Sequence, residues 1–375
     1  MKSFRKTLTV LLSLMLLTAL TVPALAGADY SVQGEETSFN KYLVVDKSAN
    51  VPNMSFSFTI EAGEEAEADE ENGTLAVMAG VDPDKITIGT AVFTPEDETT
   101  DGEESDGIAN SAEKKYATAV VTVDLSGVSF TEPGVYRYVI TEQATENDAI
   151  TPDATPRTLD VYVNNNEGEL EIAAYVFYSG EYEPEEGTGE AEEPDGKNDG
   201  FADFYESSEL TIKKTVKGNQ GSHNKYFAIT VKTEGLNEDD LFSVSGEFDR
   251  ETKSSSATTY TKAVMDKANG VEFLTGEQLN AGYTFFLHHT QSVVIQGVPK
   301  GTDYTVTEAA EDYKCTAPEN ASGTVGEEDI TVEFVNTRNG MVPTGLDLSL
   351  VSGVLPAVIG LAGAAALLRK KDRAD

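Results

Sequence analysis

The sequence predicts an all-β protein made of two tandem β-sandwich domains, and three observations support this fold class. Short segments of alternating apolar and polar residues dominate the chain, and Gly, Pro, Asn and Asp separate them. Long apolar segments of helical character occur only at the two ends of the chain. The region between the ends also repeats itself, which indicates two copies of one domain.

Two pairs of matching segments define the repeat. Residues 53–60 (NMSFSFTI) match residues 224–231 (NKYFAITV), and residues 133–142 match residues 299–308. We therefore expect one sandwich at residues 29–206 and a second at residues 207–340. The extra length of the first copy lies mainly in its acidic loops.

The first 26 residues have the features of a secretion signal. Three basic residues precede an apolar run from Leu8 to Leu20, and Ala24-Leu25-Ala26 supplies a small-x-small cleavage pattern. The run is short for a membrane span, so we predict a signal peptide at residues 1–26 and secretion of the chain.

Residues 341–375 combine three features in a fixed order. Val342-Pro343-Thr344-Gly345 comes first, a largely apolar stretch at 346–368 follows, and a basic tail ends the chain. The apolar stretch is long enough for a transmembrane helix, with the tail on the cytoplasmic side. An ordinary tail-anchored protein would share these two features. The Pro-Thr-Gly, however, resembles the sorting signal of sortase substrates, cut between Thr and Gly. It is one residue shorter than the usual Leu-Pro-x-Thr-Gly and looks like the variant of some pilus-specific sortases.

Composition excludes several classes of function. A formal net charge of −38 argues against nucleic acid and anionic membranes as partners. Acidic patches at 61–71, 96–106 and 181–195 are expected to lie in solvated loops. The spacing of their carboxylates does not match a calcium-binding loop. The single cysteine, Cys315, allows no intrachain disulfide. We expect no cofactor and no metal, because His223, His288 and His289 lack further ligands and fit surface or strand-end positions. The sequence contains no nucleophile–base pair or phosphate loop that would favour a secreted enzyme.

Ionisable and amide residues occur on strand faces that are otherwise apolar. Side chains alternate along a strand, so Lys41 shares the face of Phe39 and Leu43, while Arg137, Thr141 and Lys213 are expected to face outward. An isolated buried charge is costly, which would favour strand ends that splay into water. Two complete sets in the same order argue against that alternative. The sets are Lys41, Glu142 and Asp203 in the first domain, and Lys214, Glu308 and Asn336 in the second.

A buried Lys–Glu–Asp/Asn set allows one specific reaction. Burial lowers the pKa of a lysine and raises that of a glutamate. A neutral amine can then attack the side-chain carbonyl of Asp or Asn, while the protonated Glu polarises that carbonyl and shuttles protons. We expect a Lys41–Asp203 bond with release of water and a Lys214–Asn336 bond with release of ammonia. Each bond would form once, within the chain, so the protein would not be an enzyme.

Both domains resemble the streptococcal-type pilin isopeptide-linkage domain, which is similar to the B-repeats of collagen-binding adhesins. This resemblance implies Ig-like sandwiches, with Glu142 and Glu308 as the promoting acids. Asp203 stands where the family usually has Asn. The segments that carry the resemblance are Phe39–Leu43, Val51–Asn53, Pro133–Tyr136, Val139–Glu142, Leu210–Lys214, Thr305–Glu308 and Phe334–Asn336.

The resemblance also implies a function and partners. The implied function is that of a pilus subunit at the cell surface. A pilus or housekeeping sortase would join its Thr344 to an identical subunit or anchor it to peptidoglycan. Pilins of this type have an acceptor lysine just before the last strand of the first domain, where this chain has Lys197. The alternative for Lys197 is a surface lysine that balances an acidic loop. The alternative for the protein is a non-polymerising, wall-anchored adhesin or minor pilin, possibly with host surface ligands.

Overall fold

The computed structural model describes residues 34–68, 75–104, 107–180, 183–184, 191–192, 195–197, 200–253 and 258–340. The predicted signal peptide at 1–26, the sorting motif at 342–345 and the apolar stretch at 346–368 lie outside these residues. Within the described ranges, no helix combines the length and apolar character needed to cross a membrane.

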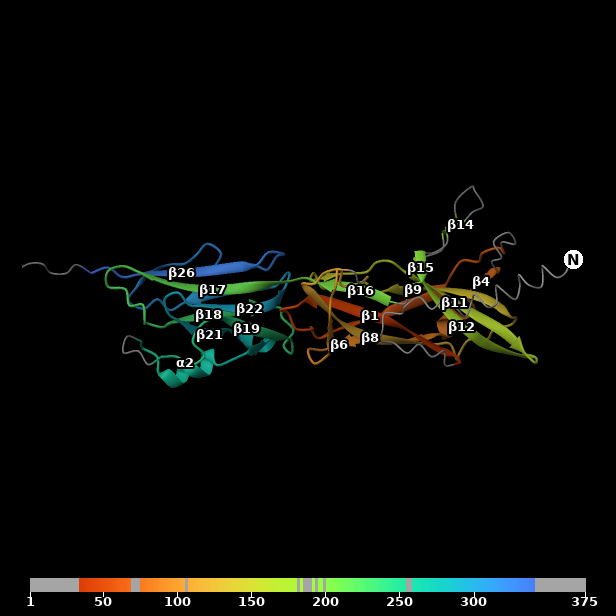
Figure 1. Cartoon of the computed structure of the whole chain (residues 1–375), viewed down its shortest axis with the longest axis horizontal. Helices are drawn as coiled ribbons and strands as arrows, with labels where there is room; N and C mark the ends of the chain where they lie inside the picture. Colours follow the sequence, from red (N-terminus) through yellow and green to blue (C-terminus); the bar gives the residue numbers. More distant parts are fainter. Residues whose placement is uncertain are drawn as a thin grey trace, which may run out of the picture.

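The chain forms two β-rich domains arranged in line along the long axis of the molecule (Figure 1). In each domain two sheets face each other, and the apolar side chains between them form one main core. The first core includes Phe39, whose ring lies 4.9 Å from the ring of Phe58 on the opposite sheet. The mostly β prediction is therefore confirmed.

The first domain has two six-stranded sheets. One has the order β10-β16-β1-β8-β5, with β7 also paired to β8, and the other has the order β15-β12-β11-β9-β3, with β4 also paired to β9. Two further strand pairs are β2–β6 and β13–β14. The bounds are β1 (Glu36–Asp46), β2 (Met54–Phe56), β3 (Phe58–Ala62), β4 (Val77–Ala79), β5 (Thr87–Ile88), β6 (Ala91–Phe93), β7 (Thr99–Asp101), β8 (Lys114–Asp124), β9 (Gly134–Glu142), β10 (Ile150–Thr151), β11 (Arg157–Asn166), β12 (Glu169–Ser179), β13 (Glu183–Pro184), β14 (Ala191–Glu192), β15 (Asp195–Lys197) and β16 (Gly200–Tyr205), with a 3-10 turn, η1, at Pro83–Lys85.

The second domain has a six-stranded sheet of order β20-β19-β22-β17-β26-β24 and a four-stranded sheet of order β21-β18-β23-β25. A single residue, Glu206, separates its first strand, β17, from β16. The bounds are β17 (Ser207–Lys217), β18 (Phe227–Glu234), β19 (Leu241–Glu247), β20 (Phe273–Thr275), β21 (Tyr283–Leu287), β22 (Ser292–Pro299), β23 (Asp303–Glu308), β24 (Lys314–Thr316), β25 (Ser322–Thr324) and β26 (Ile330–Thr337), with helices α2 (Lys262–Asn269) and α3 (Gly276–Ala281).

The first and last strands of each domain pair with each other in parallel. In the first domain β1 pairs with β16 and Lys41 lies opposite Phe201; in the second β17 pairs with β26 and Lys214 lies opposite Phe334. Asp203 and Asn336 each lie two residues beyond that partner, on the same face of the sheet. In both domains, therefore, the first strand, which carries the lysine, pairs in parallel and in the same register with the last strand, which carries the Asp or Asn.

The second domain also contains two short helices that the strand alternation did not predict. Helix α2 begins after Thr261, whose side chain accepts a hydrogen bond from the Val264 amide. Helix α3 has a capping box between Thr275 and Gln278. Both helices have at most eight residues, which is too short for a helical repeat to stand out from the surrounding alternation.

Arg137 does not face solvent as predicted, although Thr141 and Lys213 do. Arg137 points away from the Tyr138 side of β9, yet it is only 6% exposed and forms two 2.7 Å hydrogen bonds with the Asp160 carboxylate on β11. The chain around Gly63 covers this outer face, and the Gly63 amide donates to the Arg137 carbonyl. The alternation gave the correct face, but it could not predict this cover.

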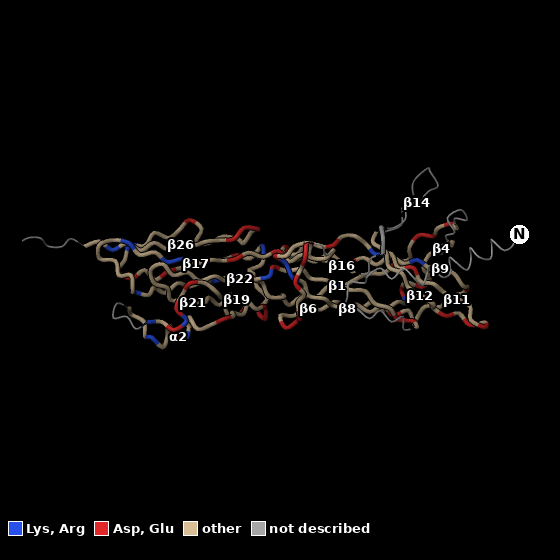
Figure 2. Tube along the Cα trace, viewed as in Figure 1, with Lys and Arg blue, Asp and Glu red and all other residues tan. Residues whose placement is uncertain are grey.

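Many of the charged residues lie along the loops and edges of both domains (Figure 2). The described acidic residues of the patches at 61–71 and 96–106 are exposed, as expected for solvated loops. Most of the third patch, at 181–195, lies outside the described residues.

Candidate functional site

The first domain brings its predicted set together between the two sheets. Lys41 Nζ lies 2.6 Å from Glu142 Oε2 and 2.5 Å from Asp203 Oδ1. The side chains of Lys41 and Asp203 are fully buried, and that of Glu142 is 5% exposed. The ammonium also lies 4.4 Å from the centroid of the Phe56 ring. A lysine, two carboxyl groups and an aromatic face thus share one water-excluded site.

The second domain has the corresponding arrangement. Lys214 Nζ lies 2.7 Å from Glu308 Oε1, and both side chains are at most 1% exposed. The Asn336 amide donates a hydrogen bond of 3.2 Å from Nδ2 to the same Glu308 oxygen. Asn336 is fully buried, and Lys214 Nζ lies 4.5 Å from the centroid of the Phe227 ring. The glutamate therefore touches both the amine and the amide.

The aromatic partners of the two lysines are residues of the candidate sites that sequence reasoning did not single out. Phe56 and Phe227 occupy the same position in the repeated segments 53–60 and 224–231. A ring face next to an ammonium offsets part of the cost of its burial, by about 0.5–2 kcal/mol. The repeat could have revealed these residues, because it places one Phe in each copy at an inward position.

The surroundings shift the pKa values in the direction that amide formation requires. The pKa of Glu142 is raised to about 8, mainly by burial, with a smaller contribution from the nearby Asp203 and with Lys41 opposing the rise. Burial likewise lowers the pKa of Lys214, although Glu308 opposes this shift. Glu142 is therefore mainly protonated at neutral pH, and the neutral amine form of Lys214 is easier to reach than in water.

Cys315 lies beside the second set. It lies on β24 opposite Asn336, and its thiol donates a hydrogen bond of 3.1 Å to Glu308 Oε2. Burial, the hydrogen bond and the charge of Glu308 raise the pKa of the thiol to about 11. The thiol therefore stays protonated and acts as a donor to the glutamate. No role for Cys315 was evident from the sequence.

The remaining candidates are described only in part. Lys197 ends β15, an edge strand, where its backbone pairs with Tyr178 on β12, and its side chain lies outside the description. The sortase motif, with Thr344, lies beyond the last described residue. His288 and His289 directly follow β21, in agreement with strand-end positions. Among the described residues no three His, Cys, Asp or Glu side chains gather as a metal site.

Comparison with known families separates the two domains. Residues 38–198 match the Spy0128-like isopeptide containing domain (FctA), a match that includes Lys41, Glu142 and Lys197 and ends before Asp203. Residues 208–338 match a domain of unknown function (DUF7601). The resemblance found in the sequence is thus confirmed, with the family match itself falling on the first domain.

Individual relatives agree with this match. The chain is 26% identical over 367 residues to a protein named Pilin from Streptococcus pyogenes serotype M1, covering 91% of this chain and 92% of that protein. The crystal structure of the major pilin from Streptococcus pyogenes is similar with a TM-score of 0.50 and 21% identity, over 82% of this chain and 100% of that one. The structure of a second major pilin from Streptococcus pyogenes is similar with a TM-score of 0.50 and 20% identity, over 82% of this chain and 98% of that one. These likenesses show that the chain has the fold of these pilins.

Proposed function

We propose that this chain, whose first domain matches the Spy0128-like isopeptide containing domain, is a structural subunit of a covalently polymerised surface pilus. The observation that carries the proposal is the pair of buried Lys–Glu–Asp/Asn sets between the first and last strands of the two domains. Each set would form an isopeptide bond without an enzyme.

In the second domain the proposed reaction joins Lys214 and Asn336. The neutral amine attacks Cγ of Asn336, and Glu308 accepts a proton from Nζ. Glu308 then protonates Nδ2, with which it already shares a hydrogen bond of 3.2 Å, and ammonia leaves. One N–H bond of the lysine and one C–N bond of the asparagine are exchanged for an amide and ammonia.

In the first domain the same scheme joins Lys41 and Asp203, with water as the leaving group. Lys41 Nζ lies 2.5 Å from the Asp203 carboxylate, so attack requires little movement. Glu142, with its pKa raised to about 8, supplies and recovers the proton at neutral pH. Each glutamate is regenerated, but each site reacts only once.

Such bonds suit a fibre under tension. Each bond would connect a domain's first strand to its last strand, which already lie side by side. A pull on the chain ends would then load covalent bonds in place of the hydrogen bonds between these strands. The domain boundary at 206/207 is consistent with this scheme, because each set falls within one domain.

We further propose that a sortase cleaves after Thr344 and transfers its carbonyl to Lys197 of an identical subunit, or to peptidoglycan in anchored chains. The edge position of β15 supports Lys197 as an acceptor, because no strand covers that side of the described sheet. The signal at residues 1–26, the apolar stretch at 346–368 and the basic tail support secretion and retention at the cell wall before transfer.

A wall extract of the native cells tests polymerisation. We expect a ladder of high-mass species that reacts with an antibody to this chain and disappears in a Lys197→Ala strain. Lys213→Ala, which removes an exposed lysine of the second domain, is the matched control and should leave the ladder intact. A ladder in the Lys197→Ala strain would reject the acceptor. A single anchored species in all strains would favour the non-polymerising adhesin or minor pilin.

The intact mass of the purified mature chain tests the internal bonds. We expect a deficit of one water plus one ammonia relative to the sequence mass. Glu142→Ala should restore the water and Glu308→Ala the ammonia, each without effect on the other domain. An unreduced mass for the native chain would refute both bonds.

A further inference from the structure

The two carboxylate oxygens of Asp203 have different surroundings. Oδ1 lies 2.5 Å from Lys41 Nζ and accepts a hydrogen bond of 2.9 Å from the main-chain N–H of Asp153. Oδ2 is buried and has no hydrogen-bond partner among the described residues. An oxygen that becomes negative in a tetrahedral intermediate gains most from an N–H donor. The asymmetry therefore indicates which oxygen remains in the amide and which leaves.

The donor belongs to the short loop between β10 and β11, which Arg157 ties to the last strand of the domain. Arg157 Nε and Nη2 donate to the Gly200 carbonyl at 2.9 and 2.6 Å, and Nη1 donates to the Thr155 carbonyl at 2.5 Å. Its guanidinium group also lies 4.5 Å from the centroid of the Phe201 ring. The buried arginine therefore fixes the loop against β16.

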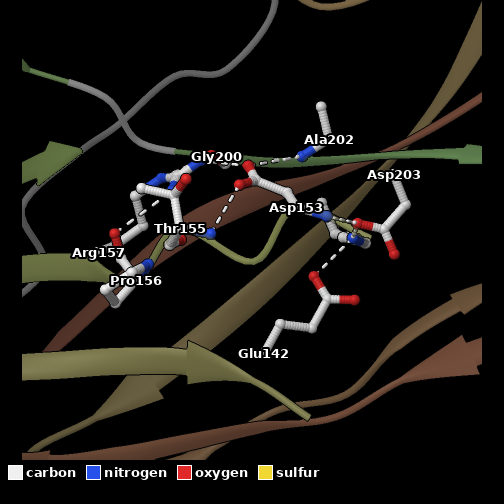
Figure 3. Close-up of polar contacts among 9 residues, drawn as sticks. Glu142, Asp153, Thr155, Pro156, Arg157, Gly200, Ala202 and Asp203 are labelled. Atoms are coloured by element: carbon white, nitrogen blue, oxygen red, sulfur yellow. Dashed lines mark hydrogen bonds and ion pairs between the residues drawn. The ribbon is translucent and has the colours of Figure 1, made fainter. Parts of the chain in front are cut away.

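The Asp153 carboxylate completes the connection. It accepts hydrogen bonds from Arg157 Nη2 at 2.5 Å, from the Thr155 amide at 3.1 Å and from the Ala202 amide at 3.4 Å. Figure 3 shows Asp153 between Arg157 and Gly200 on one side and Asp203 on the other. The Asp153 side chain thus faces Arg157, and its main-chain N–H faces the carboxyl group of Asp203.

We propose that the main-chain N–H of Asp153 stabilises the oxyanion that forms on Oδ1 of Asp203, and that Arg157 and the Asp153 carboxylate are positioning groups that hold this N–H in place. The inference rests on the Lys41–Asp203 bond proposed above. It adds to that reaction a donor and two positioning side chains from a loop outside the Lys–Glu–Asp set.

The step balances within the site. A proton moves from Lys41 Nζ to Glu142, and Glu142 passes a proton to Oδ2 of Asp203, which leaves a neutral amine, a neutral aspartic acid and a protonated Glu142. Nζ attacks Cγ, the carbonyl electrons move to Oδ1, and the Asp153 N–H stabilises the resulting charge. Glu142 protonates the Oδ2 hydroxyl, which departs as water as the Oδ1 carbonyl re-forms. Glu142 then regains a proton from the nitrogen.

The second domain lacks this donor within its described residues. Oδ1 of Asn336 has no hydrogen-bond partner there, and the strand opposite Asn336 presents Cys315, whose thiol bonds to Glu308. The hydrogen bond from Nδ2 of Asn336 to Glu308 orients that amide. The loop donor is therefore specific to the domain with an aspartate as electrophile, where the two oxygens are chemically alike until a donor distinguishes them.

The test compares the rates of bond formation in variants of the mature chain. Chain recovered unfolded from inclusion bodies is refolded, and samples quenched over time are digested and analysed by mass spectrometry for the two cross-linked peptides. Asp153→Pro removes both the N–H and the carboxylate, whereas Asp153→Ala removes only the carboxylate and is its matched control. We expect the Lys41–Asp203 bond to form roughly 100-fold more slowly in the Pro variant than in the Ala variant.

Arg157→Lys keeps the charge but not the fork that holds two carbonyls, so we expect the same bond to form about tenfold more slowly than in the native chain. The Lys214–Asn336 bond serves as a control within each molecule and should form at the native rate. Protease resistance of the first domain establishes that each variant has folded.

The outcomes separate the two proposals. Absence of the Lys41–Asp203 peptide from the native chain would refute the bond itself. Its presence, together with equal rates in the folded Pro and Ala variants, would overturn the role of the N–H. If the Pro variant does not fold, the Arg157→Lys variant decides the question. A native rate of Lys41–Asp203 bond formation in this folded variant would overturn the positioning role of Arg157. A reduced rate, with the Lys214–Asn336 bond forming at its native rate, would support that role.

Discussion

Two buried lysines, Lys41 and Lys214, each contact a glutamate and an aromatic ring. Lys41 also contacts Asp203, whereas Asn336 of the second set contacts Glu308. An ammonium removed from water costs several kcal/mol, and a pair of charges in a dry site rarely recovers that cost fully. Conversion of the lysine to an amide removes the charge altogether. At the scale of the residue, these sites would therefore be more stable after the proposed reaction than before it.

The protonation of Glu142 predicts a pH dependence for the first bond. Its pKa, raised to about 8 by burial, keeps the carboxyl protonated below that pH and allows ionisation above it. Because the reaction uses the protonated acid, we expect the rate of Lys41–Asp203 formation during refolding to be flat below pH 8 and to fall as the pH rises through 8. Mass spectrometry of quenched samples measures this rate.

Glu142→Gln supplies the control for this profile. It has no titrating carboxyl group, so any residual bond formation should show no fall near pH 8. A native rate that rises steadily from pH 7 to pH 9 would mean that the protonated form of Glu142 does not control the reaction.

The parallel pairing of first and last strands is the feature that matters at the scale of the element. β17 and β26 are neighbours over eight residue pairs, from Leu210 and Ile330 to Lys217 and Thr337. Few local contacts hold such strands together, since the whole domain lies between them in sequence. A covalent bond between these strands therefore acts on the part of the domain with the highest cost of loop closure.

Loss of the second bond should reduce stability by a large and calculable amount. A cross-link from Lys214 to Asn336 closes a loop of roughly 120 residues, for which restriction of the unfolded chain is worth about 4–5 kcal/mol. We expect Asn336→Ala to lower the free energy of unfolding of the second domain by about that amount in guanidinium titrations. Lys213→Ala should leave it nearly unchanged, because Lys213 is exposed. A loss below about 1 kcal/mol would contradict the proposed bond.

At the scale of the whole molecule, the two domains are joined by one residue and by direct contacts. Glu206 alone separates β16 from β17. Asp240 of the second domain accepts hydrogen bonds of 2.7 and 3.1 Å from the main chain and side chain of Asn53 in the first. Gly297, at φ +75°, lies so close to Ala49 that a Cβ there would be 2.8 Å from the Ala49 Cβ. Such a junction favours a stiff rod.

Removal of the Asp240 contact should make the junction between the domains more flexible without preventing the proposed isopeptide bond in either domain. In Asp240→Ala the Asn53 amide groups lose their acceptor, and small-angle X-ray scattering should report a broader distribution of shapes. Asp239→Ala is the matched control, since Asp239 is an exposed neighbour. The intact mass should be that of the native chain apart from the substitution. Identical scattering from both variants would mean that packing at Gly297, and not the hydrogen bonds, stiffens the rod.

The sequence by itself determined the all-β class, the repeat and the six residues of the two buried sets. The repeat follows from the two pairs of matching segments. The fold class and the six residues follow from strand alternation, which is a local property: an ionisable residue in an inward register is visible without knowledge of its partner. The same alternation put Lys213 outside and Lys214 inside, in agreement with the structure. The short helices α2 and α3 were too brief for their periodicity to be detected.

Only the tertiary structure decided what surrounds those residues. Arg137 is buried because a separate segment covers the outer face of its sheet. The Asp153 N–H reaches Asp203 across 50 positions of sequence, and a main-chain donor has no signature in a side-chain pattern. Arg157 reaches Gly200 in the same way. The sequence thus determined which groups could react, because burial follows from local alternation. The fold determined how they are held, because that depends on contacts between segments far apart in the chain.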